Sequence, residues 1–134
     1  MKWVASYLSK REYPRGLPQG SPLLLVLFTL YFSEVVEGRD KFGYMDDILV
    51  KSTASTPRAA RALLAAKVGR TVRLLEELHC PVVPAKSKYL LISKGIIYSE
   101  PLRVAGLPVL RFKLVVRWLG YWIDSKLKFD IYVK

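Results

Sequence analysis

KFGYMDDILVK, residues 41–51, is the stretch of sequence that decides the fold. Aromatic residues stand on one side of a polar centre and β-branched or aliphatic residues on the other, which predicts two short strands around a turn. Asp46 and Asp47 are expected at the tip, where the strand-forming residues end. The stretch therefore predicts an antiparallel hairpin that carries two adjacent carboxylates.

The segments on either side of this hairpin predict helices. Ser21-Pro22 is typical of a helix start, and the helix is expected to end near Glu37, before Gly38. Because it is apolar nearly all round, we expect it to be buried. Thr56-Pro57 repeats the start signal and predicts a helix over 57–79. Its apolar stripe is Leu64, Val68, Val72, Leu75 and Leu78, and its basic side chains, on or beside the opposite face, are Arg58, Arg61, Lys67, Arg70 and Arg73.

The remaining segments complete an α+β design in a single domain over residues 1–134. Residues 2–9 predict a short helix and 10–20 a loop. Further strands are expected over 89–93, 96–99, 102–105 and 114–123, with breaks at Gly95, Pro101, Gly106 and Gly120.

Composition limits the class of protein. Lys and Arg outnumber Asp and Glu by 22 to 11, and the net charge of +11 favours a polyanionic partner such as nucleic acid, although a solvated basic surface or a lipid-binding surface has the same composition. The single cysteine, Cys80, excludes a disulfide within the chain and fits an intracellular compartment. His79 and Cys80 are expected to be ordinary helix-end residues. The most apolar run, 23–32, is about half the roughly 20 residues that span a bilayer, so we expect no membrane partner.

The adjacent aspartates call for a chemical explanation. Two like charges held about 4 Å apart cost about 4 kcal/mol at an effective dielectric near 20, and a bound divalent cation removes that cost. Magnesium takes one or two protein carboxylates and completes its shell with water and phosphate oxygens. A solvated turn is the simpler alternative, since Asp is common in turns. The loop before residue 21 also allows a structural and a functional interpretation. It is either a simple connector or a backbone that approaches a base closely at Gly16 and Gly20, where Gln19 offers both donor and acceptor groups.

Two motifs in this order carry a family resemblance. Arg15-Gly16-Leu17-Pro18-Gln19-Gly20-Ser21-Pro22-Leu23 resembles the second palm motif of reverse transcriptases, and Phe42-Gly43-Tyr44-Met45-Asp46-Asp47 resembles their catalytic motif. The chain is most similar to the non-long-terminal-repeat retrotransposon type. Residues 3–11, the lysine motif 85–88 and the Trp-Leu-Gly segment 116–124 extend the likeness over nearly the whole chain.

The resemblance implies a partial polymerase palm that serves RNA-directed DNA polymerisation, a nucleotidyl transfer with Mg²⁺ as cofactor and an RNA template, a DNA primer and dNTPs as partners. It implies that Asp46 and Asp47 are catalytic and metal-binding, and that Lys86 assists the leaving pyrophosphate. Nucleotide or template contacts are implied for Arg15, Pro18, Gln19, Gly20, Tyr44 and Met45, and a primer grip for Leu119 and Gly120. Trp118 and Trp122 are expected to pack in the core rather than to stack on bases.

The chain departs from the family pattern in its carboxylates. The two-metal site of the family needs a third carboxylate from a strand before the first helix, and only Met1 and Lys2 precede Trp3. Fingers and a complete thumb are also expected to be missing, so the chain resembles a truncated or decayed copy that is inactive alone. A nucleic-acid-binding remnant without chemistry and a purely structural fragment are the alternatives.

Overall fold

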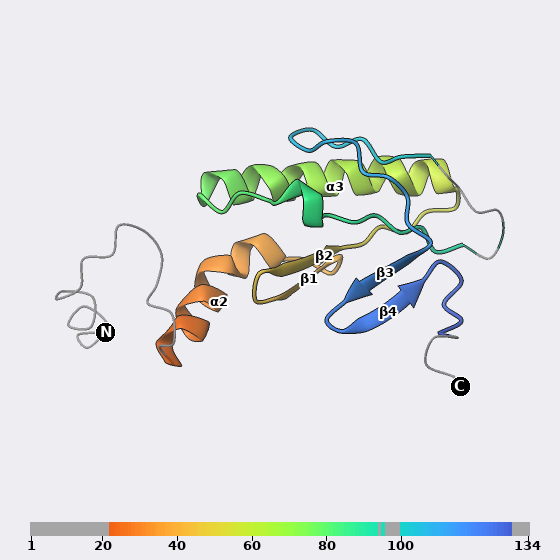
Figure 1. Ribbon diagram of the computed structural model, residues 1–134. Coiled ribbons are helices and arrows are strands. Elements are labelled where there is room, and N and C mark those ends of the chain that lie inside the picture. Colours follow the sequence, from red (N-terminus) through yellow and green to blue (C-terminus); the bar gives the residue numbers. More distant parts are fainter. Residues whose placement is uncertain (1–21, 94, 96–99, 130–134) are drawn as a thin grey trace.

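The computed structural model describes residues 22–93, 95 and 100–129. Its architecture is α+β, with two helices and two small antiparallel hairpins (Figure 1). In chain order the elements are α2 (Pro22–Val36), β1 (Lys41–Tyr44), β2 (Asp47–Val50), α3 (Pro57–Glu77), the short 3-10 helix η1 (Pro84–Lys86), β3 (Val115–Trp118) and β4 (Tyr121–Asp124). The expected α+β class and the first hairpin are therefore confirmed, while the helix expected over 2–9 and the loop over 10–20 lie outside the described residues.

Helix α3 forms where the sequence predicts it. Thr56 is in the extended conformation at its start, and its side-chain oxygen accepts a hydrogen bond from the backbone N–H of Ala59. The helix ends at Glu77, two residues before the predicted end. His79 takes a left-handed φ of 55°, which lets the N–H of Cys80 donate to the carbonyl of Leu75 at 2.8 Å. His79 and Cys80 therefore form a helix end, as expected from the sequence.

The apolar face of α3 serves two separate core clusters. Near its N-terminal half, Leu64 and Val68 pack against a cluster from the C-terminal part of the chain, whose buried members are Tyr89, Leu102, Val104 and Leu110. Near its C-terminal half, Leu75 joins the second cluster with Phe32 and Val35 of α2. Figure 1 shows α3 lying along the molecule, with α2 and the first hairpin on one side of it. The long helix is thus the common support of both halves.

The predicted boundaries of α2 are closely confirmed, but the prediction that the helix is buried is wrong. Val35 is fully buried and Phe32 nearly so, whereas Leu30 is 66% exposed. Leu25, Val26 and Tyr31 are also exposed. Among the described residues, α2 packs against α3, the segment just after α3 and the first hairpin, and one helix face is enough for these contacts. Apolar composition all round a helix does not reveal how many neighbours will cover it.

The strands predicted after α3 form only in part. Residues 115–124 make the hairpin β3–β4, with the predicted break at Gly120. The prediction of strands over 89–93 and 102–105 is wrong. These segments make only single bridges, Tyr89 with Phe112 and Leu102 with Leu110. Their apolar side chains pack on α3, and their backbones do not form a continuous set of strand hydrogen bonds. An apolar run in the sequence therefore indicates burial but not strand pairing. The strand expected over 96–99 lies outside the described residues.

No helix in the described ranges combines the length and the apolar character needed to cross a membrane. With one cysteine in the sequence, Cys80, no disulfide forms within the chain.

Close contact between α2 and β1 at Gly43 yields the first prediction. A Cβ atom at Gly43 would lie 2.4 Å from Cγ1 of Val36. Valine is restricted to one χ1 rotamer in a helix, so Val36 cannot turn away. We expect Gly43→Ala to lower the free energy of unfolding by about 1–3 kcal/mol, the usual cost of overpacking. Urea unfolding followed by circular dichroism measures this change.

The matched control is Gly95→Ala, because a Cβ at Gly95 meets no atom within 4 Å. Adding Val36→Ala to Gly43→Ala should restore part of the lost stability, since it removes the clashing methyl groups. Equal stabilities for the Gly43→Ala and Gly95→Ala variants would contradict the close contact.

Candidate functional site

The β1–β2 hairpin brings the aspartate motif to a tight turn. Tyr44 pairs with Asp47, so only Met45 and Asp46 form the turn between the strands. Met45 has a φ of 51°, in the left-handed region that costs a non-glycine residue about 1–2 kcal/mol. The sequence prediction placed both aspartates at the tip, and the structure separates them: Asp46 belongs to the turn, whereas Asp47 is the first residue of β2.

Both carboxylates are open to solvent. Neither forms a hydrogen bond or an ion pair with any residue in the described part of the chain. Tyr44 and Met45 beside them are also exposed. Carboxylate oxygens are the ligands that hard divalent cations prefer, so the turn can offer one or two such ligands. Within the described ranges, no three His, Cys, Asp or Glu side chains gather into a larger metal-binding group.

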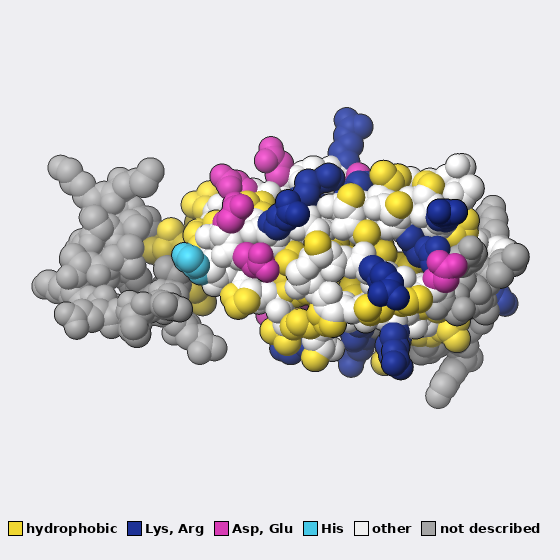
Figure 2. Space-filling view, turned by 90° about the horizontal axis from the view of Figure 1, so that it is seen from above, with side chains coloured by type: hydrophobic (Ala, Val, Ile, Leu, Met, Phe, Trp, Pro, Cys, Tyr) yellow, Lys and Arg dark blue, Asp and Glu magenta, His cyan; other side chains and the backbone are white. Residues whose placement is uncertain are grey.

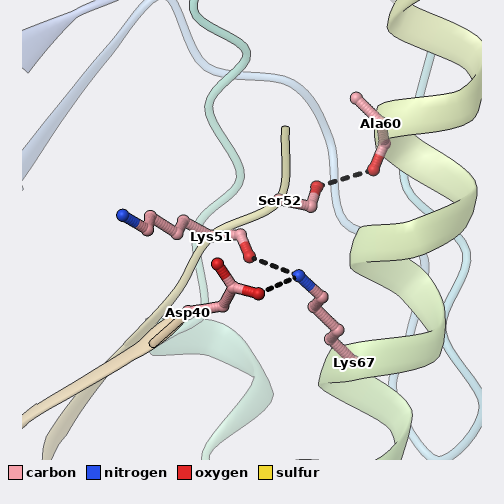
Figure 3. Close-up of polar contacts among 5 residues, drawn as sticks. All are labelled: Asp40, Lys51, Ser52, Ala60 and Lys67. Carbon is pink, nitrogen blue, oxygen red and sulfur yellow. Dashed lines mark hydrogen bonds and ion pairs between the residues drawn. The ribbon is translucent and has the colours of Figure 1, made fainter. Parts of the chain in front are cut away.

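The base of the hairpin is fastened to α3 by one lysine (Figure 3). Nζ of Lys67 lies 2.5 Å from Oδ2 of Asp40, just before β1, and 3.4 Å from the carbonyl oxygen of Lys51, just after β2. The N–H of Lys51 in turn donates to the carbonyl of Asp40 at 2.8 Å. The hydroxyl of Ser52 donates to the carbonyl of Ala60 at 2.7 Å and adds a second tie to the helix. The two ends of the hairpin are thus held together on α3, which orients the turn at its other end.

The other predicted site residues are dispersed or lie outside the described residues. Lys86 ends η1, is exposed and forms no ion pair with either aspartate. Leu119 and Gly120, the predicted primer grip, are the turn of the β3–β4 hairpin, and both have the positive φ, 48° and 86°, that a type I′ turn requires. The predicted nucleotide or template contacts before the helix, Arg15, Pro18, Gln19 and Gly20, fall outside the described residues.

The tryptophans of the second hairpin differ from the expectation that both pack in the core. Trp118 is half-buried, but Trp122 is 40% exposed. Arg117 pairs with Trp122 across the strands, and its guanidinium lies 5.8 Å from the centre of the Trp122 ring. Directly opposed residues share a face of a hairpin, so a cation and an aromatic ring stand together on an exposed surface.

The basic side chains of α3 have unequal surroundings. Lys67 is paired with Asp40 and Arg61 forms an ion pair with Glu100, and the side chains of both are largely buried. Arg58, Arg70 and Arg73 are exposed. Figure 2 shows this side of the molecule. Among the charged side chains, acidic ones gather near the histidine at one end, and Lys and Arg are more numerous elsewhere on this face. The expected basic face is therefore confirmed for three of its five members, whereas Arg61 and Lys67 are turned into ion pairs with other segments and are largely buried.

Sequence reasoning missed the contacts that hold these surfaces in place. Asp40 and Glu100 each pair with a basic residue of α3 that is distant in the sequence. The only sequence signal was that α3 itself contains no acid before Glu76. An acidic residue is a candidate for a long-range ion pair when a nearby helix has basic side chains without local acidic partners. The sequence pattern does not show which of these basic side chains it will contact.

Comparisons with protein-family models, with curated proteins and with solved structures gave no match to this chain.

The Lys67–Asp40 pair predicts a dependence of stability on pH. The hydrogen bond from Lys67, helped by the charges of Lys67 and Lys51, lowers the pKa of Asp40 from 3.8, against the opposing effect of desolvation. A lowered pKa means that the pair stabilises the fold above about pH 3.8 and that this contribution is lost as the pH falls through the lower folded-state value. We expect Asp40→Asn to be less stable than the parent chain at pH 7, with the difference shrinking towards pH 3.

Urea unfolding at a series of pH values measures this difference, and Glu77→Gln, which changes an exposed acid at the end of α3, is the matched control. A difference between the parent chain and Asp40→Asn that stays constant from pH 7 to pH 3 would show that the pair does not hold the hairpin.

Proposed function

We propose that this chain is a palm fragment of a reverse transcriptase of the non-long-terminal-repeat retrotransposon type. The observation that carries the proposal is the Tyr44-Met45-Asp46-Asp47 sequence on a two-residue hairpin turn with both carboxylates exposed. The Gly-Pro-rich motif of residues 15–23 before the first helix adds to it, because the two motifs together and in this order are specific. The fold class is compatible with a palm, and the palm identity itself belongs to the proposal.

The proposed role of the turn is to hold Mg²⁺. Asp46 lies in the turn and Asp47 at the start of β2, so their oxygens can reach a metal ion or a metal-bound phosphate in front of the hairpin. In phosphoryl transfer such a metal ion neutralises the charge that develops on the phosphate oxygens. The resemblance asks for a third carboxylate, and no group of three acidic or other metal-ligating side chains forms among the described residues. On this proposal the turn supplies part of the metal site.

The proposed substrates are an RNA template, a DNA primer and dNTPs. The exposed turn of Leu119 and Gly120 would contact the primer. The nucleotide and the template would be contacted by Arg15, Pro18, Gln19, Gly20, Tyr44 and Met45. Lys86 is exposed and free of ion pairs with the aspartates, so a role on the leaving pyrophosphate rests on the resemblance alone. We propose that the chain by itself does not extend a primer, because two carboxylates make an incomplete two-metal site.

A second candidate function is nucleic-acid binding without chemistry. The net charge of +11 and the exposed Arg58, Arg70 and Arg73 favour it, since Lys and Arg that neutralise phosphates provide sequence-independent affinity. The two candidates differ in what the aspartates contribute. In a remnant without chemistry, the negative charge of Asp46 would oppose nucleic acid whether or not a divalent ion is present.

Metal binding at the turn is the first test. With Mn²⁺ as a paramagnetic probe, we expect selective broadening of the amide NMR signals of Tyr44 to Ile48. Asp46→Asn should weaken Mn²⁺ binding by about tenfold or more, which corresponds to the loss of one charged ligand. Glu77→Gln removes an exposed acid elsewhere and should leave the affinity unchanged. Broadening spread evenly over all acidic residues would count against a metal site at the turn.

Nucleic-acid binding and primer extension form the second test. With an RNA–DNA primer–template, Mg²⁺ should strengthen binding by the parent chain but not by Asp46→Asn, as measured by fluorescence anisotropy. An Asp46→Asn variant that binds as well or better, with and without Mg²⁺, would favour the remnant without chemistry. Template-dependent extension by the chain alone, lost in Asp46→Asn, would overturn the proposed inactivity and establish the polymerase.

A further inference from the structure

A groove lies between the N-terminal part of α3 and the segment that follows residue 99. It is a shallow hollow, largely open to solvent, with a volume of about 430 Å³. Ala62 and Ala65 of α3, together with Pro101 and Leu102, provide its apolar lining. Its charged lining residues are Arg58, Arg61, Arg103 and Glu100. In Figure 1 the turn of the β1–β2 hairpin points away from this end of α3, so the groove is separate from the aspartate turn.

The charges around the groove do not cancel. Arg61 forms an ion pair with Glu100, and its side chain is only 11% exposed, so this guanidinium is fixed and its charge is compensated. Arg58 and Arg103 are both exposed, and neither has an ion pair or a side-chain hydrogen bond with another described residue. Two uncompensated guanidinium groups therefore remain on the rim of one groove. Arg58 also lies in the first turn of α3, where the helix dipole adds positive potential.

A buried hydroxyl stands beside the compensated pair. Tyr89 is 4% exposed, and its hydroxyl has no hydrogen-bond partner among the described residues. Burial raises the pKa of Tyr89, while the charges of Arg61 and Glu100 act on it in opposite directions. Together with Arg58 and Arg103, the lining of the groove carries three guanidinium groups against one carboxylate, so cationic donors outnumber anionic acceptors there.

We propose that this groove binds a phosphate monoester, with Arg58 and Arg103 as the groups that contact the phosphate oxygens. A phosphate monoester carries a charge of about −1.5 to −2 near neutral pH, which matches two guanidinium groups better than a carboxylate or a phosphodiester does. Arginine also presents paired N–H groups that suit phosphate oxygens. The apolar lining by Ala62, Ala65 and Leu102 suits the ring system of a nucleotide. The ester would come from a free nucleotide or from the terminal phosphate of a nucleic acid strand.

Calorimetric titration of the full chain with AMP, adenosine and inorganic phosphate, at about 150 mM salt to screen weak surface attraction, tests this proposal. We expect AMP to bind and adenosine to bind at least about tenfold more weakly, as expected for the loss of charge-assisted hydrogen bonds. Arg58→Gln with Arg103→Gln should lower the AMP affinity by a similar factor. Lys126→Gln with Lys128→Gln removes the same charge from the exposed segment after β4 and should leave the AMP affinity within about twofold.

Two further arms distinguish the sources of the phosphate. A short oligonucleotide with a 5′-phosphate that binds more tightly than its unphosphorylated copy, in the parent chain but not in the Arg58/Arg103 variant, would identify a strand terminus. Binding of AMP without such a difference would identify a free nucleotide, and both results support the phosphate site. Equal binding of AMP and adenosine, or equal losses in the two double variants, would overturn it. These outcomes do not involve Asp46, so they are independent of the polymerase proposal.

Discussion

The salt bridge between Lys67 and Asp40 is the contact on which the arrangement of the hairpin depends. A two-stranded hairpin alone is marginally stable in water, and here its two ends meet at one ammonium group on α3. Because Lys67 also contacts the carbonyl of Lys51, it fixes both strands rather than one. The free end of the hairpin then carries the left-handed Met45 and the exposed aspartates. The hairpin is thus joined to α3 at its base and carries its exposed charge at the turn.

Local signals in the sequence predicted the parts of the structure that depend on neighbouring residues. The Thr56-Pro57 start of α3, the hairpin of residues 41–51 and the break at Gly120 follow from capping and turn chemistry within a few positions. The failures concern tertiary neighbours. The apolar segment 89–93 packs on α3 instead of pairing, and α2 leaves one side uncovered, because composition does not reveal how many elements lie nearby.

The candidate site also combines local features that the sequence predicted with long-range contacts that it did not. The sequence identified Asp46 and Asp47, since a motif is a local pattern, and it identified α3 as basic. It did not predict that Lys67 and Arg61 would form ion pairs with acids from distant segments, nor that Arg58 and Arg103 would line the same groove. Long-range pairing of charges decides which basic residues remain for a ligand, and this information exists only in the folded chain.

The position of α3 between two core clusters makes the two ends of the molecule thermodynamically linked. Leu64 and Val68 belong to one cluster and Leu75 to the other, so an opening that unfolds the whole of α3 disrupts both clusters. A ligand that binds only the folded helix at one end lowers the population of opened states at both. Amide hydrogen exchange in α2 and in the 102–110 loop would consequently slow together, as one cooperative unit, when either end of α3 is occupied.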